Sequence, residues 1–182
     1  MLQFGCSNIR NIAAAMGIFE AMPSTSADGF NPIRCWQHSF AVARLCEQLT
    51  SAKHPEQAGT TYLAGLCHDL GEILFRTHFG TEYALVREVQ RATSLSLKTI
   101  EQQMLGVTQK ELSFLILRCL NLPSVIRDPI ESVHHAGEPA NAVGRILRLA
   151  NGYVNGLLLA ASGTQTLSPF TIAECRRATD SD

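Results

Sequence analysis

The sequence lacks the features that mark several large classes of protein. It has no apolar run long enough for a transmembrane helix, and its six cysteines include no Cys-x-x-Cys spacing. Its 15 basic and 16 acidic residues leave a formal net charge of −1, which gives no electrostatic footprint for nucleic acid or an anionic membrane. With 46% hydrophobic and 17% charged residues over 182 positions, we expect one compact domain, without nucleic-acid or membrane partners.

Signs of β-structure, internal repeats and low-complexity tracts are also missing. Apolar residues recur at helical spacing almost throughout, and Leu122-Pro123 and Ser168-Pro169 mark a break and a capped helix start. We therefore predict an all-α fold of about eight or nine helices. The expected helices span residues 4–22, 31–52, 57–77, 80–92, 97–104, 108–121, 123–134, 138–161 and 168–178.

Two further absences bear on location. The apolar stretch at residues 9–22 has no basic leader or cleavage pattern and contains Arg10 and Glu20, which favours an amphipathic helix over a signal peptide. Cys35, Cys46 and Cys119 fall on apolar helical faces, as reduced core residues do. Both observations predict a cytoplasmic protein.

Among the residues that are present, His68 and Asp69 are the most informative, because two metal-binding groups lie inside an apolar helical segment. Asp69 belongs to an apolar series with spacings of four and three, formed by Tyr62, Leu66, Asp69 and Ile73. This series places the carboxylate on the buried face. Taken alone, a structural pair bonded to itself or to the backbone explains the two residues as well as a ligand site does.

Other polar residues also interrupt apolar helical faces. His38 falls in the series Cys35, His38, Val42, Leu45, Cys46 and Leu49. Asn151 falls in the series Leu147, Asn151, Val154 and Leu158. Polar positions on three helices can converge, which favours a ligand site, or the remnant of one, over unrelated core residues.

The order of these motifs resembles the HDOD family, a bacterial signalling branch of the HD-domain superfamily. The resemblance spans about residues 4–160. The motifs that carry it are Trp36-Gln37-His38-Ser39, Ala64-Gly65-Leu66-Cys67-His68-Asp69-Leu70-Gly71, Leu122-Pro123, His134-His135 and Leu149-Ala150-Asn151. The resemblance implies an HD-domain-like helical bundle with a cytoplasmic signalling role. It also implies further helices ahead of residue 1 in complete domains, so we expect an N-terminal portion to be missing and two chains to pair.

In catalytic HD-domain phosphohydrolases, the resemblance implies that His38, His68, Asp69 and an Asp in place of Asn151 hold a divalent metal. Asn151 offers only a neutral carbonyl oxygen, so it should add much less to metal affinity than a carboxylate would. His38, His68 and Asp69 still match a set of two histidines and one carboxylate, which suits iron, manganese or zinc. We expect no cofactor or a weakly bound divalent metal.

Relatives that cleave cyclic di-GMP bind a second metal, using a His where this chain has Gln109 and histidines at the positions of His134 and His135. An amide oxygen suits calcium better than the transition metals, so the change to Gln109 weakens this second position. These relatives also carry a Lys where this chain has Glu72. That reversal of charge predicts repulsion of an anionic substrate.

Three functions remain open on this evidence. The first is a non-catalytic signalling module with a degenerate metal site, which acts through a protein partner or a small nucleotide-like ligand. The second is a metal-dependent phosphohydrolase, for which the site would have to generate a nucleophile and neutralise phosphate oxygens. The third is an apolar interaction domain whose polar cluster is purely structural. Weakened metal ligands and reversed charge favour the first.

Overall fold

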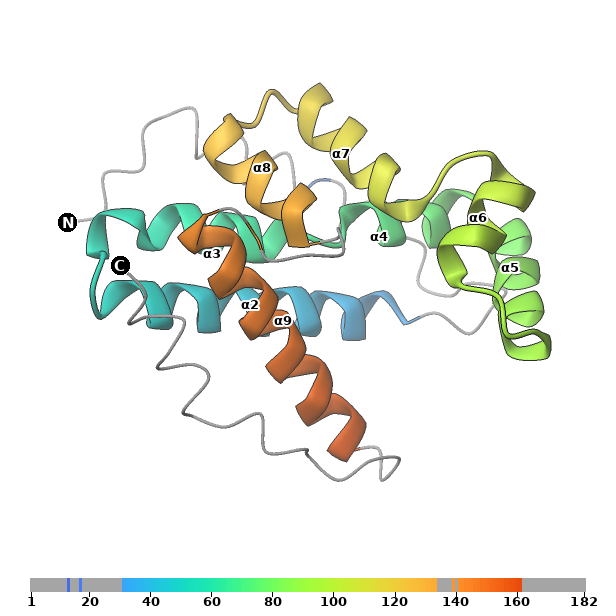
Figure 1. Cartoon of the computed structure of the whole chain (residues 1–182), viewed down its shortest axis with the longest axis horizontal. Coiled ribbons are helices and arrows are strands. Elements are labelled where there is room, and N and C mark those ends of the chain that lie inside the picture. Colours follow the sequence, from blue (N-terminus) through green and yellow to red (C-terminus); the bar gives the residue numbers. More distant parts are fainter. Residues whose placement is uncertain (1–12, 14–16, 18–30, 134–138, 140, 162–182) are drawn as a thin grey trace.

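The computed structural model describes residues 13, 17, 31–133, 139 and 141–161, and every regular element in these residues is helical (Figure 1). The elements are α2 (Pro32–Ser51), η1 (Pro55–Gln57), α3 (Ala58–Cys67), α4 (Leu70–His78), α5 (Gly80–Ala92), α6 (Leu97–Leu105), α7 (Gln109–Cys119), α8 (Ser124–Val133) and α9 (Ala142–Ala161). The prediction of an all-α fold is confirmed. The helices expected at residues 4–22 and 168–178 lie outside the described residues.

Local signals in the sequence fix several helix ends. The side chain of Asn31 accepts a hydrogen bond from the backbone N–H of Arg34 at 3.2 Å, which caps α2 just ahead of Pro32. Thr108 and Glu111 form a reciprocal capping box at the start of α7. α6 ends at Leu105, and its C-cap Gly106 has a φ of 73°, which glycine adopts without the strain that a Cβ brings. These signals explain why most of the expected boundaries lie within a few residues of the observed ones.

One expected helix, at residues 57–77, is wrong because the structure divides it into α3 and α4. The backbone N–H of Gly71 donates to the hydroxyl of Ser113 at 2.8 Å, instead of continuing the helical ladder. A Cβ on Gly71 would lie 1.9 Å from the backbone oxygen of Gln109, so only glycine permits this approach of α7. The helix is therefore interrupted at His68 and Asp69, which separate α3 from α4.

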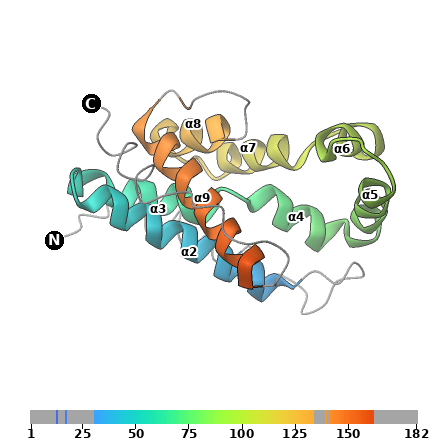
Figure 2. The same cartoon turned by 60° about the horizontal axis from the view of Figure 1, so that its bottom comes forward.

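Most of the helices share one core. Figures 1 and 2 show α2 and α3 side by side with α9 across them, and α8 also packs against α3 and α9. α2 and α3 come so close that a Cβ on Gly65 would lie 2.7 Å from the Cα of Ala43. The largest fully buried side chains of this core are Val42, Leu63, Leu70, Ile73, Leu117, Ile130 and Leu147. This close packing fixes the positions of the residues that project between α2, α3 and α9.

A smaller core lies at the end of the molecule formed by α5 and α6 (Figure 2). Its buried members are Phe75, Tyr83, Val86 and Ile100. α4 links the two cores, because Ile73 belongs to the main core and Phe75 to the smaller one.

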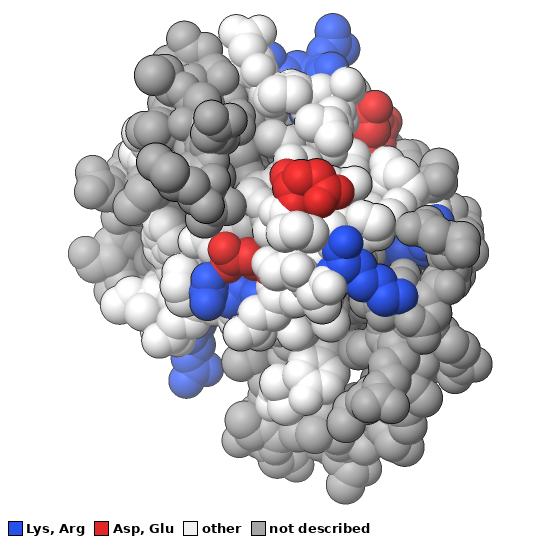
Figure 3. Space-filling view, turned by 90° about the vertical axis from the view of Figure 1, so that its left-hand side faces the viewer, with Lys and Arg blue, Asp and Glu red and all other residues white. Residues whose placement is uncertain are grey.

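On the face that Figure 3 shows, basic and acidic side chains of the described residues are interspersed with neutral ones, and neither sign of charge dominates. This distribution agrees with the near-balanced composition of the sequence. Within the described residues, no helix combines the length and the apolar character needed to cross a bilayer.

Candidate metal centre

A helix and a helix junction bring His38, His68 and Asp69 together. His38 lies within α2, whereas His68 and Asp69 form the junction at which α3 ends and α4 begins. The ring centroids of the two histidines are 5.3 Å apart. The close contact of α2 and α3 at Gly65 holds the two rings at this separation. The break in the helix is therefore part of the site.

The three side chains point their ligand atoms at one another. The Nε2 atom of His68 is 3.0 Å from Oδ2 of Asp69, and the Nε2 atom of His38 is 3.4 Å from the same oxygen. The two Nε2 atoms are 3.4 Å apart. One ligand atom from each residue lies within 4.8 Å of the others, a separation that one metal ion can bridge.

A backbone contact orients His68. Its Nδ1 atom lies 2.8 Å from the carbonyl oxygen of Gly65, so Nδ1 carries a proton and donates it to that oxygen. Nε2 then faces Asp69 and is the nitrogen that can bind a metal. A bound metal is commonly supported in this way by a hydrogen bond from the far ring nitrogen of its histidine.

The electrostatics of the site favour an ion pair. Burial alone would raise the pKa of Asp69, but the charge of His68 and hydrogen bonds from both histidines hold it well below its usual range. Burial alone would lower the pKa of His68, but the charge of Asp69 and hydrogen bonds raise it. Asp69 thus provides a counter-charge for the buried imidazole of His68 and accepts a hydrogen bond from His38.

Asn151 of α9 lies beside this cluster. Its side chain forms a hydrogen bond with His68 that favours the charged imidazole, and its Oδ1 atom also accepts a hydrogen bond from Asn155 at 2.9 Å. The structure therefore brings Asn151 together with His68, as the sequence predicts for the fourth position. The side chain at this fourth position is a neutral amide, and its oxygen already accepts a hydrogen bond from Asn155, one turn along α9.

Glu72 lies one turn after the junction, and its carboxylate is paired. Its Oε1 atom is 3.0 Å from Nε of Arg76, and the Glu72 side chain is 31% exposed. Burial and the charge of Asp69 raise the pKa of Glu72, whereas Arg76 opposes that shift. The pairing means that Glu72 repels an anion less than its sequence position alone implies.

Gln109, at the expected second metal position, lies against Gly71 just after the junction. Gln109 begins α7, and its Oε1 atom lies 3.4 Å from the hydroxyl of Tyr83 in the smaller core. The backbone N–H of Gln109 donates to Oε2 of Glu101 at 3.1 Å. His134 and His135 lie outside the described residues.

Two partners in this region were missed by the sequence analysis. The spacing of four residues from Glu72 to Arg76 could have indicated their ion pair. Glu101 is only 1% exposed and accepts a hydrogen bond from the hydroxyl of Tyr83 at 2.9 Å. Eighteen positions separate these two residues, so no local pattern signals that contact.

The donor set fits a transition metal. Iron, manganese and zinc accept two imidazoles and one carboxylate as ligands. The three side chains converge, and the hydrogen bond from Nδ1 of His68 to Gly65 orients one of the imidazoles. Cys67 is fully buried beside the junction and belongs to the main core, whereas Cys119, which was expected to be a core residue, is exposed. Among the His, Cys, Asp and Glu residues that the structure describes, His38, His68 and Asp69 form the group that could hold a metal ion.

Comparison with known proteins agrees with this geometry. Residues 2–136 match the family model of the HDOD domain. No curated protein matches the chain significantly. The match covers His38 of α2, His68 and Asp69 of the junction and the expected second metal position, while Asn151 lies beyond it.

Solved structures share the fold. A predicted phosphohydrolase from Shewanella amazonensis SB2B matches with a TM-score of 0.69 and 18% identity over 97% of this chain and 64% of its own. An HDOD domain protein of unknown function from Geobacter sulfurreducens matches with a TM-score of 0.68 and 19% identity over 97% and 61%. The response regulator MmoQ from Methylococcus capsulatus str. Bath matches with a TM-score of 0.65 and 26% identity over 82% and 58%. The chain thus spans less than two thirds of the length of each of these proteins.

Proposed function

Because this chain belongs to the HDOD family, we propose that it is a signalling module with a degenerate HD metal site, which acts through contacts with a protein or a small ligand and not by catalysis. The observation that carries the proposal is the neutral side chain of Asn151 beside His68. A carboxylate there would add a charge and a strong ligand, whereas the amide adds neither. Gln109, at the expected second metal position, is bonded to Tyr83 instead.

Any metal at this site would be held by His38, His68 and Asp69. Such an ion would supply Lewis-acid chemistry towards a phosphate oxygen or a bound water. In this chain, Gly65 would keep His68 in the tautomer that presents Nε2, and Asp69 would supply the only carboxylate of the three. Metal binding at Nε2 of His68 competes with the proton that the neighbouring Asp69 favours there.

The metal content of the protein tests this proposal. Protein purified without added metal should carry well below one equivalent of iron, manganese or zinc after gel filtration, measured by elemental analysis. A firm one or two equivalents would overturn the proposal of a degenerate site.

A metal-dependent phosphohydrolase is the second candidate, and one observation favours it. His38, His68 and Asp69 converge within 4.8 Å, and Arg76 pairs with Glu72, so the charge that opposes an anionic substrate is reduced. The assay is hydrolysis of cyclic di-GMP and of a simple phosphate ester with manganese or iron. Our proposal expects no turnover that depends on the site. Turnover that a His68→Ala, Asp69→Ala double variant abolishes would establish the second candidate.

We also propose that this module is cytoplasmic and that two chains pair. A cytoplasmic location is supported by six cysteines without a disulfide-like or metal-ribbon spacing. Pairing of two chains is supported by exposed apolar side chains on α2 and α9, namely Ile33, Phe40 and Leu157. Sedimentation at several protein concentrations tests the pairing, and a single monomeric species throughout would contradict it.

A further inference from the structure

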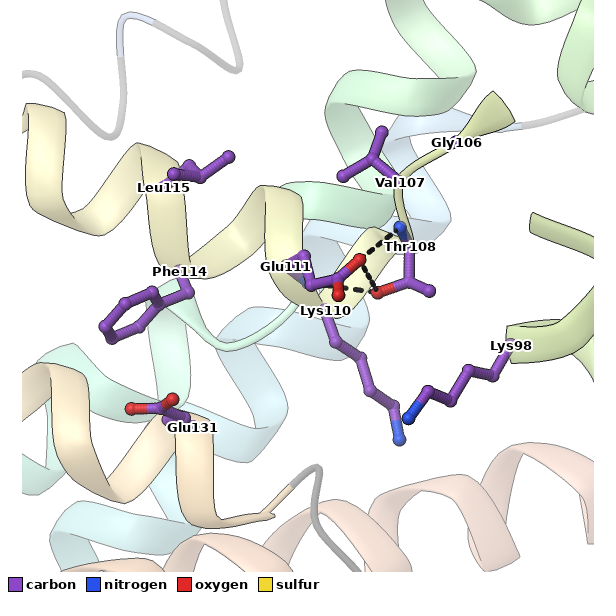
Figure 4. A pocket seen from close by; sticks show the side chains of 9 residues that line it. All are labelled: Lys98, Gly106, Val107, Thr108, Lys110, Glu111, Phe114, Leu115 and Glu131. Carbon is purple, nitrogen blue, oxygen red and sulfur yellow. Dashed lines mark hydrogen bonds between the residues drawn. The ribbon is translucent and has the colours of Figure 1, made fainter. Parts of the chain in front are cut away.

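A cavity of about 530 Å³ lies between α6, α7 and α8, apart from the His–Asp cluster (Figure 4). Its volume falls in the range of pockets that bind small molecules, about 300–1,000 Å³. None of His38, His68 and Asp69 lines it. Apolar side chains of Val107, Phe114 and Leu115 and charged side chains from three helices share the lining.

One end of the cavity is cationic. Lys98 comes from α6 and Lys110 from α7, and Figure 4 shows both side chains extending into the same part of the cavity. The carboxylate of Glu111 also lines the cavity and accepts hydrogen bonds from Thr108, so the two lysines leave a net positive charge that favours an anion. Lysines bind phosphate as point charges, and two of them can share one phosphate group.

Backbone N–H groups at the start of α7 already have partners within the protein, so they offer little to an anion. The N–H of Gln109 donates to Glu101, and the N–H of Glu111 donates to the hydroxyl of Thr108. The carboxylate of Glu111 in turn accepts from the N–H and the hydroxyl of Thr108, at 2.9 and 3.0 Å. The helix end is therefore occupied by its own cap, and the two lysines are the groups that would hold an anion.

The other end of the cavity offers a ring and a carboxylate. Phe114 lies one turn beyond Lys110, and Figure 4 shows Glu131 of α8 beside its ring. The guanidinium of Arg118 lies 5.8 Å from the centroid of the Phe114 ring, which limits how that ring can turn. A flat ring can pack against Phe114, and the carboxylate of Glu131 can accept hydrogen bonds from N–H groups on that ring.

We propose that this cavity binds a nucleoside diphosphate, with its phosphates on Lys98 and Lys110 and its base against Phe114 and Glu131. A nucleoside diphosphate is a class of metabolite that combines an anionic end with a flat ring bearing N–H donors, which is the order of groups along the cavity. The inference deepens the proposed ligand-binding role of the module. It rests on this cavity and needs no metal at the His–Asp cluster.

The test is calorimetric titration of the whole chain with ADP in EDTA, so that no metal contributes. ADP should bind saturably, whereas pyrophosphate and adenosine should each bind at least about tenfold more weakly, because each keeps only one end of the ligand. Lys98→Ala, Lys110→Ala and Glu131→Gln should each weaken ADP about tenfold, the loss expected for one charge-assisted hydrogen bond. Phe114→Leu should also weaken ADP while leaving pyrophosphate unchanged.

Two controls separate this site from the rest of the molecule. Lys53→Ala removes an exposed lysine after α2 and should leave ADP binding unchanged, and thermal melts of all variants show that they remain folded. The EDTA in these titrations keeps metal from the His–Asp cluster, which separates this site from the metal centre. Absence of saturable ADP binding, pyrophosphate binding as tight as ADP, or unaltered binding in the Lys98 and Lys110 variants would each overturn the proposal. The metal-content test is unaffected by any of these results.

Discussion

At the scale of single residues, Asp69 holds the site together without a metal. Its Oδ2 atom faces the Nε2 atoms of both His38 and His68, and its side chain is only 21% exposed. Two imidazoles and a carboxylate in this arrangement share at least one proton. The carboxylate of Asp69 thus provides a negative charge next to the buried histidines. Both a structural role and a metal-binding role of the site require this charge.

Replacing Asp69 by Asn should destabilise the protein most in a defined pH window. The lowered pKa of Asp69 means that its stabilisation is present above about pH 4 and is lost as the pH falls further. The raised pKa of His68 means that its stabilisation is full below about pH 6.5 and is lost as the pH rises through the folded-state pKa. Between these limits, Asp69→Asn should cost about 3 kcal/mol, the penalty of a broken buried pair.

Urea unfolding of both proteins at about pH 3, about pH 5.3 and about pH 7.5, which lie about one unit below, midway between and about one unit above those limits, measures the difference. The gap between wild type and Asp69→Asn should be widest at the middle value. A gap of the same size at all three values would mean that the two residues do not form an ion pair.

Asn151→Asp should restore metal affinity. A second carboxylate near Asp69 places two like charges in a buried site, so the metal-free variant should be less stable than the parent. Manganese relieves this repulsion, and a ligand at a hundredfold excess over Kd stabilises the folded state by about 2.7 kcal/mol. The melting temperature of the variant should therefore rise by several degrees with manganese, and that of the parent much less.

Adding His38→Ala to the Asn151→Asp variant should abolish the manganese shift, because one imidazole ligand is gone. Thermal melts with and without manganese give the comparison. An equal response in the parent and in Asn151→Asp would mean that residue 151 does not face the cluster.

At the scale of elements, the separation of α3 from α4 depends on a contact with α7. Gly71→Ala would place a Cβ 1.9 Å from the backbone oxygen of Gln109 and 2.5 Å from the hydroxyl of Ser113. Because backbone cannot move aside cheaply, we expect a loss of about 3 kcal/mol or more in unfolding free energy. The matched control is Gly152→Ala in α9, where no atom lies within 4 Å and a gain of about 0.4–1 kcal/mol is expected.

Chemical denaturation of Gly71→Ala and Gly152→Ala beside wild type measures both changes. A Gly71→Ala protein within about 0.5 kcal/mol of wild type, the range of an ordinary surface change, would show that α4 and α7 do not meet at this glycine.

The same contact shows where sequence reasoning about the elements succeeds and where it stops. α5, Gly80–Ala92, coincides with the predicted residues 80–92, because its apolar spacing is carried within the segment. The break at His68 and Asp69 could not be predicted, since it depends on Ser113, which lies 42 positions from Gly71. Periodicity identifies a helix, whereas an interruption imposed by another helix leaves no local pattern.

For the site, the sequence predicted the convergence of His38, His68 and Asp69 from helical faces and motif order, and the structure places them within 4.8 Å. The partner of Gln109 could not be foreseen in the same way. Tyr83 is 26 positions away on α5, and only the packing of the smaller core brings its hydroxyl to Gln109.

At the scale of the whole molecule, the two cores differ in size and in their relation to the site. The main core includes residues of α2, α3, α4, α7, α8 and α9, whereas the smaller core, formed by α4, α5 and α6, has four buried members among the described residues. A unit with few buried apolar contacts opens at a lower free energy than the rest of a protein. His38 and Asn151 lie on helices of the main core, so opening of α5 and α6 leaves both in place.

Hydrogen exchange of the Asn151→Asp variant should therefore show two responses to manganese. Amides of α2, α3 and α9 should exchange more slowly with manganese, because the ion binds only when these helices are packed and stabilises that state by mass action. Amides of α5 and α6 should exchange faster than those of the main core and should change little, since their opening does not release the ion. Slowing of equal size in all of these helices would mean instead that both cores open in one cooperative step.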